Sequence, residues 1–404
     1  MVFTAASQTI IVTPILPLIG DALNVPEARW GLLITVYSIS LALAALIMGP
    51  VSDRIGRRRI LLLGSGALAV ALALHGLVTS FGTLLGARAV AGACGGILSG
   101  AAVSYVGDYF PYERRGWATG WVMSGIPFGI VLGVPIGRVL AAGLGFLTPF
   151  VAFSALMVGA FVLILLVVPQ PDVDKEKSRM TLVGTVTNYG RLLSKPEVLA
   201  AALTYFLMYL GLSLLVVYLP EWLTVHFSPL DVTVFGKPLT LAGLDVDFIA
   251  TLFLVGGLAG VVAGPMAGSF SDRVGRKPLI IVACIGLIIV TLALTYVVTD
   301  RWVAYPAYIA IMVFFSMRMS PLQALLTALV PAKQRGSFLS LTIAIGQMGT
   351  ALGAFVAGIL YASGDYRATT YASAATVLLL VLLVWKFLPE PTEDAVQQPE
   401  PVAA

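Results

Sequence analysis

Long stretches without a charged residue constrain this sequence more than any other feature. They cover 60–86, 140–171, 249–271 and 279–299. Each is at least about as long as the roughly 20 apolar residues that cross a bilayer as a helix. Only 11% of the 404 residues are charged, against about a quarter in ordinary soluble domains. We therefore expect an α-helical membrane protein.

The apolar runs and the breakers between them predict twelve transmembrane helices in two sets of six. The first set is expected at 2–21, 30–52, 59–79, 82–109, 116–141 and 145–168, and the second at 198–223, 247–271, 277–298, 302–329, 336–361 and 367–388. This predicts bundles at 1–169 and 197–389, joined by a polar linker at 170–196 that contains a short amphipathic helix. The Pro-, Glu- and Gln-rich tail at 390–404 is expected to be disordered.

Lysine and arginine are distributed unequally between the two sets of loops. Of the 24, 17 fall in loops on one side of the predicted membrane and only 4 on the other. Cytoplasmic loops hold the excess of these residues, so both termini and the linker are expected in the cytoplasm and the protein in the plasma (inner) membrane. The start of the chain has neither a basic segment nor a small-residue cleavage site, so no removable signal peptide is expected. This asymmetry also accounts for the net charge of +4 without a nucleic-acid partner.

The two halves repeat each other. The segment 49–58, Gly-Pro-Val-Ser-Asp-Arg-Ile-Gly-Arg-Arg, recurs at 268–277 as Gly-Ser-Phe-Ser-Asp-Arg-Val-Gly-Arg-Lys, and 111–116 recurs at 331–336. Two similar six-helix units indicate a pseudo-twofold pair with a binding site between them. The repeat is interrupted by a longer loop between the seventh and eighth helices. There 232–241 alternates apolar and polar residues and predicts a β-hairpin.

The repeated segment resembles the loop signature of the major facilitator superfamily, and the resemblance covers the chain to about Pro389. It implies an all-α membrane fold of twelve transmembrane helices in two pseudo-symmetric six-helix bundles. It also implies a cytoplasmic gate that holds the outward-facing state. The matching positions are Asp53, Arg54, Arg57 and Asp108 in the first half, and Asp272, Arg273 and Arg276 in the second. Their charged groups can bridge neighbouring helix ends; the alternative is a solvated basic loop that only sets topology.

The fifth helix favours export. It reads Gly-Ile-Pro-Phe-Gly-Ile-Val-Leu-Gly-Val-Pro-Ile-Gly at 125–137. This is similar to the drug and sugar efflux permeases, the drug:proton antiporter branch, although the prolines are displaced. The alternative is that these residues only bend the helix.

The remaining three of the 24, Arg88, Arg138 and Arg318, fall within predicted spans, where a charge costs several kcal/mol unless it finds water or a partner. Arg88 is similar to the arginine of proton-linked family members and is expected to act in substrate binding or proton coupling, with Asp21 as its partner; a purely structural ion pair is the alternative. Arg318 is expected near mid-membrane. The repeat places Leu98 at the matching position, so the fold does not require this charge. We expect Arg318 to line the cavity and bind an anionic group, and snorkelling to the interface is the alternative.

No acidic residue is predicted at mid-span, so Asp21 and Glu221, near the outer ends of the first and seventh helices, are the candidates for proton carriage. Uncharged polar side chains within the spans supply candidate hydrogen bonds to a substrate, although each could equally serve helix packing. They are Gln8, Tyr37, Tyr105, Tyr209, Gln323 and Gln347.

The predicted function is secondary active transport: export of small amphiphilic organic solutes, drugs or metabolites, by alternating access with proton antiport. The alternative is transport of an organic anion or a lysolipid bound through Arg318. No nucleotide-binding loop is present, and two distant cysteines and two distant histidines predict no metal site or other cofactor. An enzyme is therefore not expected, and a channel would not need a duplicated gate. The expected partners are a small molecule, protons and the lipid bilayer, and the expected oligomeric state is a monomer.

Overall fold

The computed structural model describes the chain apart from residues 100, 171–181, 229, 235–236, 329–334 and 389–404. Some helical positions also lack a described side chain, Asp53, Arg54 and Asp108 among them. The predicted tail and the first part of the linker therefore lie outside the described residues. The second part of the linker forms the helix α10 (Leu182–Leu193).

The described part of the chain contains ten helices long and apolar enough to cross a membrane, and a bent pair makes an eleventh span. One of the ten, Ser340–Phe387, has 48 residues, or about 70 Å of helix, which is more than twice the hydrocarbon thickness of a bilayer. Non-helical backbone at Gly364 and Asp365 divides it. Counted as two spans, it completes the twelve, and the predicted fold class is confirmed.

The N-terminal bundle begins with the bent pair α1 (Val2–Ile10) and α2 (Val12–Leu23), followed by the short η1 (Glu27–Arg29). The later helices are α3 (Leu32–Ile55), α4 (Arg57–Leu74), η2 (His75–Leu77), α5 (Phe81–Leu98), α6 (Ala101–Tyr109), α7 (Tyr112–Phe128), the π-helical η3 (Gly129–Gly133), α8 (Val134–Leu144) and α9 (Thr148–Val167). The bend of 52° between α1 and α2 follows from Pro14, which has no N–H for the carbonyl of Ile10 and whose ring crowds that carbonyl.

The C-terminal bundle comprises α11 (Pro196–Val216), α12 (Leu219–Phe227), α13 (Phe248–Val274), α14 (Arg276–Val297), α15 (Arg301–Ala328) and α16 (Arg335–Phe387). The loop between α12 and α13 forms the expected hairpin, because β1 (Thr233–Val234) pairs antiparallel with β2 (Lys237–Pro238). A second hairpin pairs β3 (Thr240–Leu241) with β4 (Leu244–Asp245).

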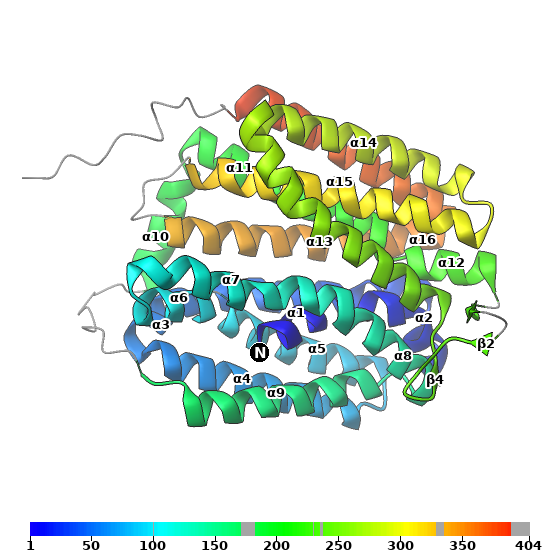
Figure 1. Ribbon diagram of the computed structural model, residues 1–404, viewed down its shortest axis with the longest axis horizontal. Helices are drawn as coiled ribbons and strands as arrows, with labels where there is room; N and C mark the ends of the chain where they lie inside the picture. The colour runs from blue at the N-terminus through cyan, green and yellow to red at the C-terminus, as the bar shows by residue number, and fades with distance from the viewer. Residues whose placement is uncertain (100, 171–181, 229, 235–236, 329–334, 389–404) are drawn as a thin grey trace, which may run out of the picture.

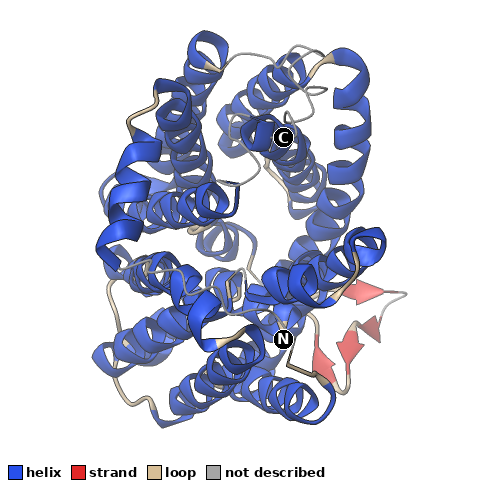
Figure 2. Cartoon of the chain, turned by 90° about the vertical axis from the view of Figure 1, so that its left-hand side faces the viewer, coloured by secondary structure: helices blue, strands red, loops and turns tan. Residues whose placement is uncertain are grey.

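The two bundles lie side by side, the N-terminal one below and the C-terminal one above in Figure 1, and Figure 2 views them end-on. Within them α3 packs on α5 and α4 on α9, and α11 packs on α16 and α13 on α15. Between them α3 packs on α16, and α8 on α13. We call the end that carries 57–59 and 276–277 the basic end, and the opposite end, where β1–β4 lie, the hairpin end.

Candidate functional site

An ion pair joins the two bundles at the hairpin end. Nε and Nη2 of Arg138, on α8, lie 2.7 and 2.6 Å from Oδ2 of Asp247, which precedes α13. Nη1 of Arg138 donates to the carbonyl of Pro14, and Oδ1 of Asp247 accepts the N–H of Ala250 as the N-cap of α13. The side chains are only 4% and 15% exposed. A buried pair with its remaining polar atoms bonded in this way is costly to break from one side.

Tyr218 makes a second polar contact between the bundles. This fully buried side chain lies between α11 and α12, and its hydroxyl accepts the N–H of Gly31 and donates to the carbonyl of Glu27 at 2.6 Å. Its ring stacks on Trp30 of the N-terminal bundle and on Tyr361 of α16. One residue of the C-terminal bundle thereby ties down the turn that leads into α3.

Backbone contacts complete this end of the interface. The hydroxyl of Thr35, on α3, donates to the carbonyl of Ala351 on α16 at 2.8 Å. Gly31 lies against the carbonyl of Ala354 so closely that a Cβ atom would overlap it. A Cβ atom on Gly358 would come within 2.6 Å of the carbonyl of Ala28. We call the ion pair of Arg138 with Asp247, the hydrogen bonds of Tyr218 and Thr35, and the close contacts of Gly31 and Gly358 the latch. The latch joins the two bundles at the hairpin end.

Three carboxylates gather beside this latch. Glu221, on α12, is buried and interacts electrostatically with Glu27 and Asp21 of the N-terminal bundle and with Arg138. Asp21 is exposed at the end of α2. The acids predicted for proton carriage therefore lie together across the bundle contact.

Arg88 is buried inside the N-terminal bundle, and its expected pairing with Asp21 is wrong. Its two Nη atoms donate to the carbonyl of Gln8 at 3.2 and 3.3 Å, and the guanidinium lies 4.0 Å from the centre of the Tyr37 ring. A backbone dipole and an aromatic face replace the carboxylate. The side-chain amide of Gln8 and Nε of Arg88 find no partner among the described residues.

Arg318 differs from the prediction in the direction of its side chain. The guanidinium is fully buried inside the C-terminal bundle, where Nη2 lies 3.4 Å from the carbonyl of Met208 on α11 and Nη1 lies 4.0 Å from Sγ of Cys284 on α14. The ring of Phe315 lies 5.1 Å away. The side chain neither lines an open cavity nor snorkels to an interface, so the predicted position for binding an anion is not observed.

The structure brings the predicted substrate-binding residues into two separate groups. Arg88, Gln8 and Tyr37 form one inside the N-terminal bundle. Tyr209 interacts electrostatically with Arg318 inside the other. The other three make no hydrogen bond to either group within the described part of the chain: Tyr105 donates to the carbonyl of Pro169, Gln323 is exposed, and Gln347 is half-buried with an Oε1 that has no hydrogen-bond partner among the described residues.

The repeated charged segment holds each bundle together at the basic end. Arg58 donates to the carbonyls of Val168 and Leu165 at the end of α9. Lys277, its counterpart in the repeat, donates to the carbonyl of Trp385 at the end of α16. Cations at helix C-termini satisfy otherwise unpaired carbonyls and oppose the negative end of the helix dipole.

Of the predicted gate residues, Asp272 near the end of α13 and Arg276 at the start of α14 pair with each other at 3.9 Å across the turn at Gly275. Arg57 lies at the start of α4, and Arg273 is exposed on α13. The side chains of Asp53, Arg54 and Asp108 lie outside the described residues. The gate therefore remains a prediction.

We expect Arg58→Gln to lower the free energy of unfolding by about 1 to 3 kcal/mol, because two charge-assisted bonds to helix-end carbonyls are lost. Thermal unfolding of the purified protein measures this change. Arg59→Gln is the matched control, since Arg59 is exposed on the same turn of α4. Equal unfolding temperatures for the two variants would contradict the capping role.

Sequence reasoning missed the latch. Arg138 falls within the predicted span 116–141, and Asp247 falls at the start of the predicted span 247–271. The two residues are 109 positions apart, and no sequence pattern links them. Tyr218 offered no signal beyond its place at the end of an apolar run.

Among the residues that the structure describes, no group of three or more His, Cys, Asp or Glu side chains could hold a metal ion. Cys94 and Cys284 are separate, buried thiols.

Comparison with known proteins agrees with this architecture. The family model for the Major Facilitator Superfamily matches residues 1–244 and 201–403. The uncharacterized MFS-type transporter YbcL of Bacillus subtilis (strain 168) is 23% identical over 380 residues, which cover 94% of this chain and 92% of YbcL. Multidrug resistance protein MdtG of Klebsiella pneumoniae (strain 342) is 25% identical over 406 residues, covering 98% and 93% of the two chains. The crystal structure of a D-xylose-proton symporter, 17% identical, matches with a TM-score of 0.76 over 96% of both chains. The present chain is thus an integral membrane protein that belongs to the Major Facilitator Superfamily.

Proposed function

We propose that this transporter exports small amphiphilic organic solutes by alternating access. The observation that carries the proposal is the latch at the hairpin end. It joins two six-helix bundles through one ion pair, a few hydrogen bonds and close backbone contacts, all of which can separate without unfolding either bundle. Rocking of one bundle against the other about a central site is the ordinary way in which such paired repeats move a solute.

Three observations support export of drug-like molecules. Relatives along nearly the whole chain are named multidrug resistance proteins. Gly125 of α7 and Gly129 and Gly133 of η3 pack directly on α1, where a Cβ atom on Gly129 or Gly133 would meet Phe3 and Ser7. Cytoplasmic loops carry the excess of lysine and arginine, and this supports a plasma-membrane orientation in which the basic end faces the cytoplasm and the latched hairpin end faces outward. We infer that the structure is the inward-facing state of a monomer.

We further propose that the acids beside the latch couple export to proton entry. Glu221 faces Glu27 and Asp21 across the bundle contact, with Tyr218 and Tyr361 close by and Arg138 as the nearby cation. Ionised carboxylates on opposite sides repel each other and oppose closure, and protonation removes that repulsion. A proton taken up from the outside would therefore favour closing the outer end and returning the site to the cytoplasm.

The test uses purified protein in vesicles and a panel of amphiphilic cations, organic anions, sugars and lysophospholipids. We expect a pH gradient to drive uptake of at least one amphiphilic cation. Uptake confined to sugars or to lysophospholipids would contradict the proposed cargo class. Arg318 gives no support to an anionic cargo here, because its guanidinium is enclosed by α11, α14 and α15.

For coupling, we expect Glu221→Gln or Asp21→Asn to abolish uptake driven by a pH gradient while downhill exchange continues, because a neutral amide cannot carry the proton. Asp300→Asn is the control, since Asp300 is an exposed acid at the same end whose side chain accepts the N–H of Trp302. Full pH-driven uptake by both Glu221→Gln and Asp21→Asn would show that these acids do not carry the proton.

A further inference from the structure

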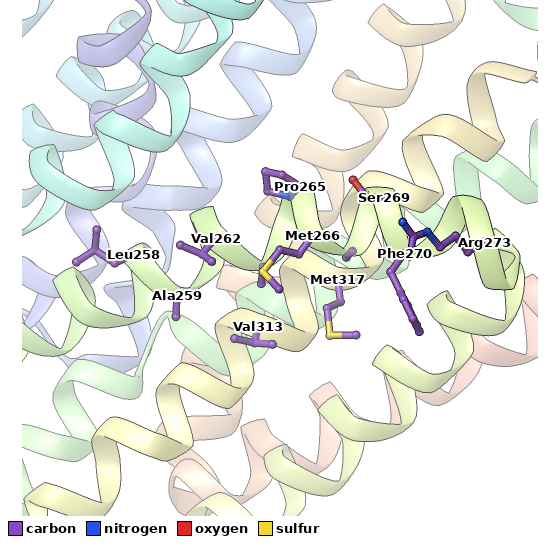
Figure 3. Close-up of a pocket in the computed structure, with 12 residues that line it drawn as sticks. Leu258, Ala259, Val262, Pro265, Met266, Ser269, Phe270, Arg273, Val313 and Met317 are labelled. Carbon is purple, nitrogen blue, oxygen red and sulfur yellow. The ribbon is translucent and has the colours of Figure 1, made fainter.

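A long apolar groove runs along the C-terminal bundle between α13 and α15, away from the latch. Its volume is about 1070 Å³. Figure 3 shows its side chains: Leu258, Val262, Met266 and Phe270 project from α13, and Val313 and Met317 lie on α15. The four residues of α13 are spaced four apart, so they form one stripe along the helix.

The groove faces the membrane rather than the other bundle. The four stripe residues are between 50% and 66% exposed. The inner faces of α13 are already occupied, since Gly256 packs against Tyr308 of α15 and Gly257 packs against Val131 of η3. In a protein surrounded by lipid, apolar side chains exposed on the outer face meet acyl chains.

The dimensions and charge of the groove select the kind of lipid. From Leu258 to Phe270 the stripe rises about 18 Å, close to the roughly 15 Å of hydrocarbon in one leaflet. Arg273 follows one turn later at the basic end and is the charged residue among those that line the groove. In Figure 3 its guanidinium turns back toward Ser269 over the groove. Asp272, the adjacent acid, pairs with Arg276 instead.

We propose that the groove binds an anionic phospholipid from the leaflet at the basic end. One acyl chain lies along the stripe, and the phosphate group lies at Arg273, with the Ser269 hydroxyl as a further donor. A guanidinium recognises phosphate through paired N–H bonds, and anionic lipids are attracted to basic residues at the membrane surface. The occupant is therefore a lipid with a net negative headgroup, because a zwitterionic lipid of the same chains gains less from Arg273.

The test is native mass spectrometry of the full-length protein with phosphatidylglycerol and phosphatidylcholine that carry identical acyl chains. We expect phosphatidylglycerol to be retained preferentially. Arg273→Gln should reduce its apparent affinity about fivefold, the change expected for one basic residue near an anionic surface, and Arg273→Lys should keep most of it. Arg59→Gln is the matched control, because Arg59 is an exposed arginine at the basic end outside the groove. Met266→Trp fills the groove and should reduce retention of both lipids.

Each variant is first checked by thermal unfolding, so that loss of lipid is not mistaken for loss of fold. Equal retention of the two lipids by the parent protein would overturn the choice of an anionic lipid. Unchanged retention by both Arg273→Gln and Met266→Trp would overturn the site. Displacement of phosphatidylglycerol by ethidium, mole for mole, would show that the groove takes cargo instead of lipid.

Discussion

Replacing Asp247 with asparagine is expected to open the hairpin end of the protein. Asparagine is a good N-cap, so the N–H of Ala250 keeps its partner. Arg138 instead keeps its charge in a buried position without the carboxylate that it contacts, and Glu221 interacts with it only electrostatically. Removing one member of a buried pair costs about 3 to 5 kcal/mol. At the lower end, appropriate for a partly exposed Asp247, the ratio of latched to open molecules falls roughly 100-fold.

Spin-label distances between the bundles measure this shift. One label pair joins Leu77 to Trp302 at the hairpin end, and a second joins Arg59 to Lys386 at the basic end; all four side chains are exposed. Asp247→Asn should lengthen the first distance and shorten the second, which unfolding cannot mimic. Asp300→Asn, the control acid at the same end, should change neither.

A double variant separates the ion pair from other effects of the substitution. The double variant Arg138→Met, Asp247→Asn leaves neither member of the ion pair charged, so much of the latched population should return. If Asp247→Asn leaves both label distances as they are in the parent protein, the ion pair does not hold the hairpin end closed.

The fold was predictable because the bilayer imposes it. Charge-free stretches of about 20 residues leave a chain no alternative to spanning helices, and the predicted spans start and end within a few residues of most of the observed ones. The hairpin at Thr233–Pro238 was likewise predictable from the alternation of apolar and polar residues at 232–241. Local pattern and environment both specify these features.

The direction of a buried side chain was not predictable in the same way. Counting residues gave the depth of Arg318, but depth does not say which neighbour a side chain meets, because that depends on how the helix is rotated in its bundle. Arg318 points into its own bundle toward Met208. Arg88 likewise meets the Gln8 carbonyl and the Tyr37 ring, while Asp21, the partner expected from the sequence, is exposed.

The repeat explains why one edge of the interface is charged and the other is not. At the offsets of 219 and 220 between the halves, Asp247 corresponds to Ala28, and Arg138 corresponds to Gly358. Arg138 contacts Asp247 in the ion pair between α8 and α13. Their two counterparts, Gly358 and Ala28, also contact each other, where α16 packs closely on the turn before α3. The pseudo-twofold symmetry of the two bundles therefore gives two equivalent inter-bundle contacts. One of them is an ion pair, and the other is a close backbone contact at a glycine.

The close glycine contact between α16 and the turn before α3 leads to a second prediction, with an expected effect on the closed conformation comparable to that of Asp247→Asn. A methyl group on Gly31 would overlap the carbonyl of Ala354, and one on Gly358 would lie 2.6 Å from the carbonyl of Ala28. Neither backbone group can rotate away as a side chain could, so the bundles must separate at this edge. Overpacking of this kind costs about 1 to 3 kcal/mol, and here the cost falls only on the latched conformation.

We therefore expect Gly31→Ala and Gly358→Ala to lengthen the distance between labels at Leu77 and Trp302 while both proteins still unfold cooperatively. Gly86→Ala is the matched control, because a Cβ atom there meets nothing within 4 Å. The glycine and ion-pair contacts lie on opposite edges of the interface and share no partner, so Gly31→Ala should add its effect to that of Asp247→Asn. A Gly31→Ala protein whose hairpin-end distances match those of Gly86→Ala would show that the contact between α3 and α16 does not hold this end closed.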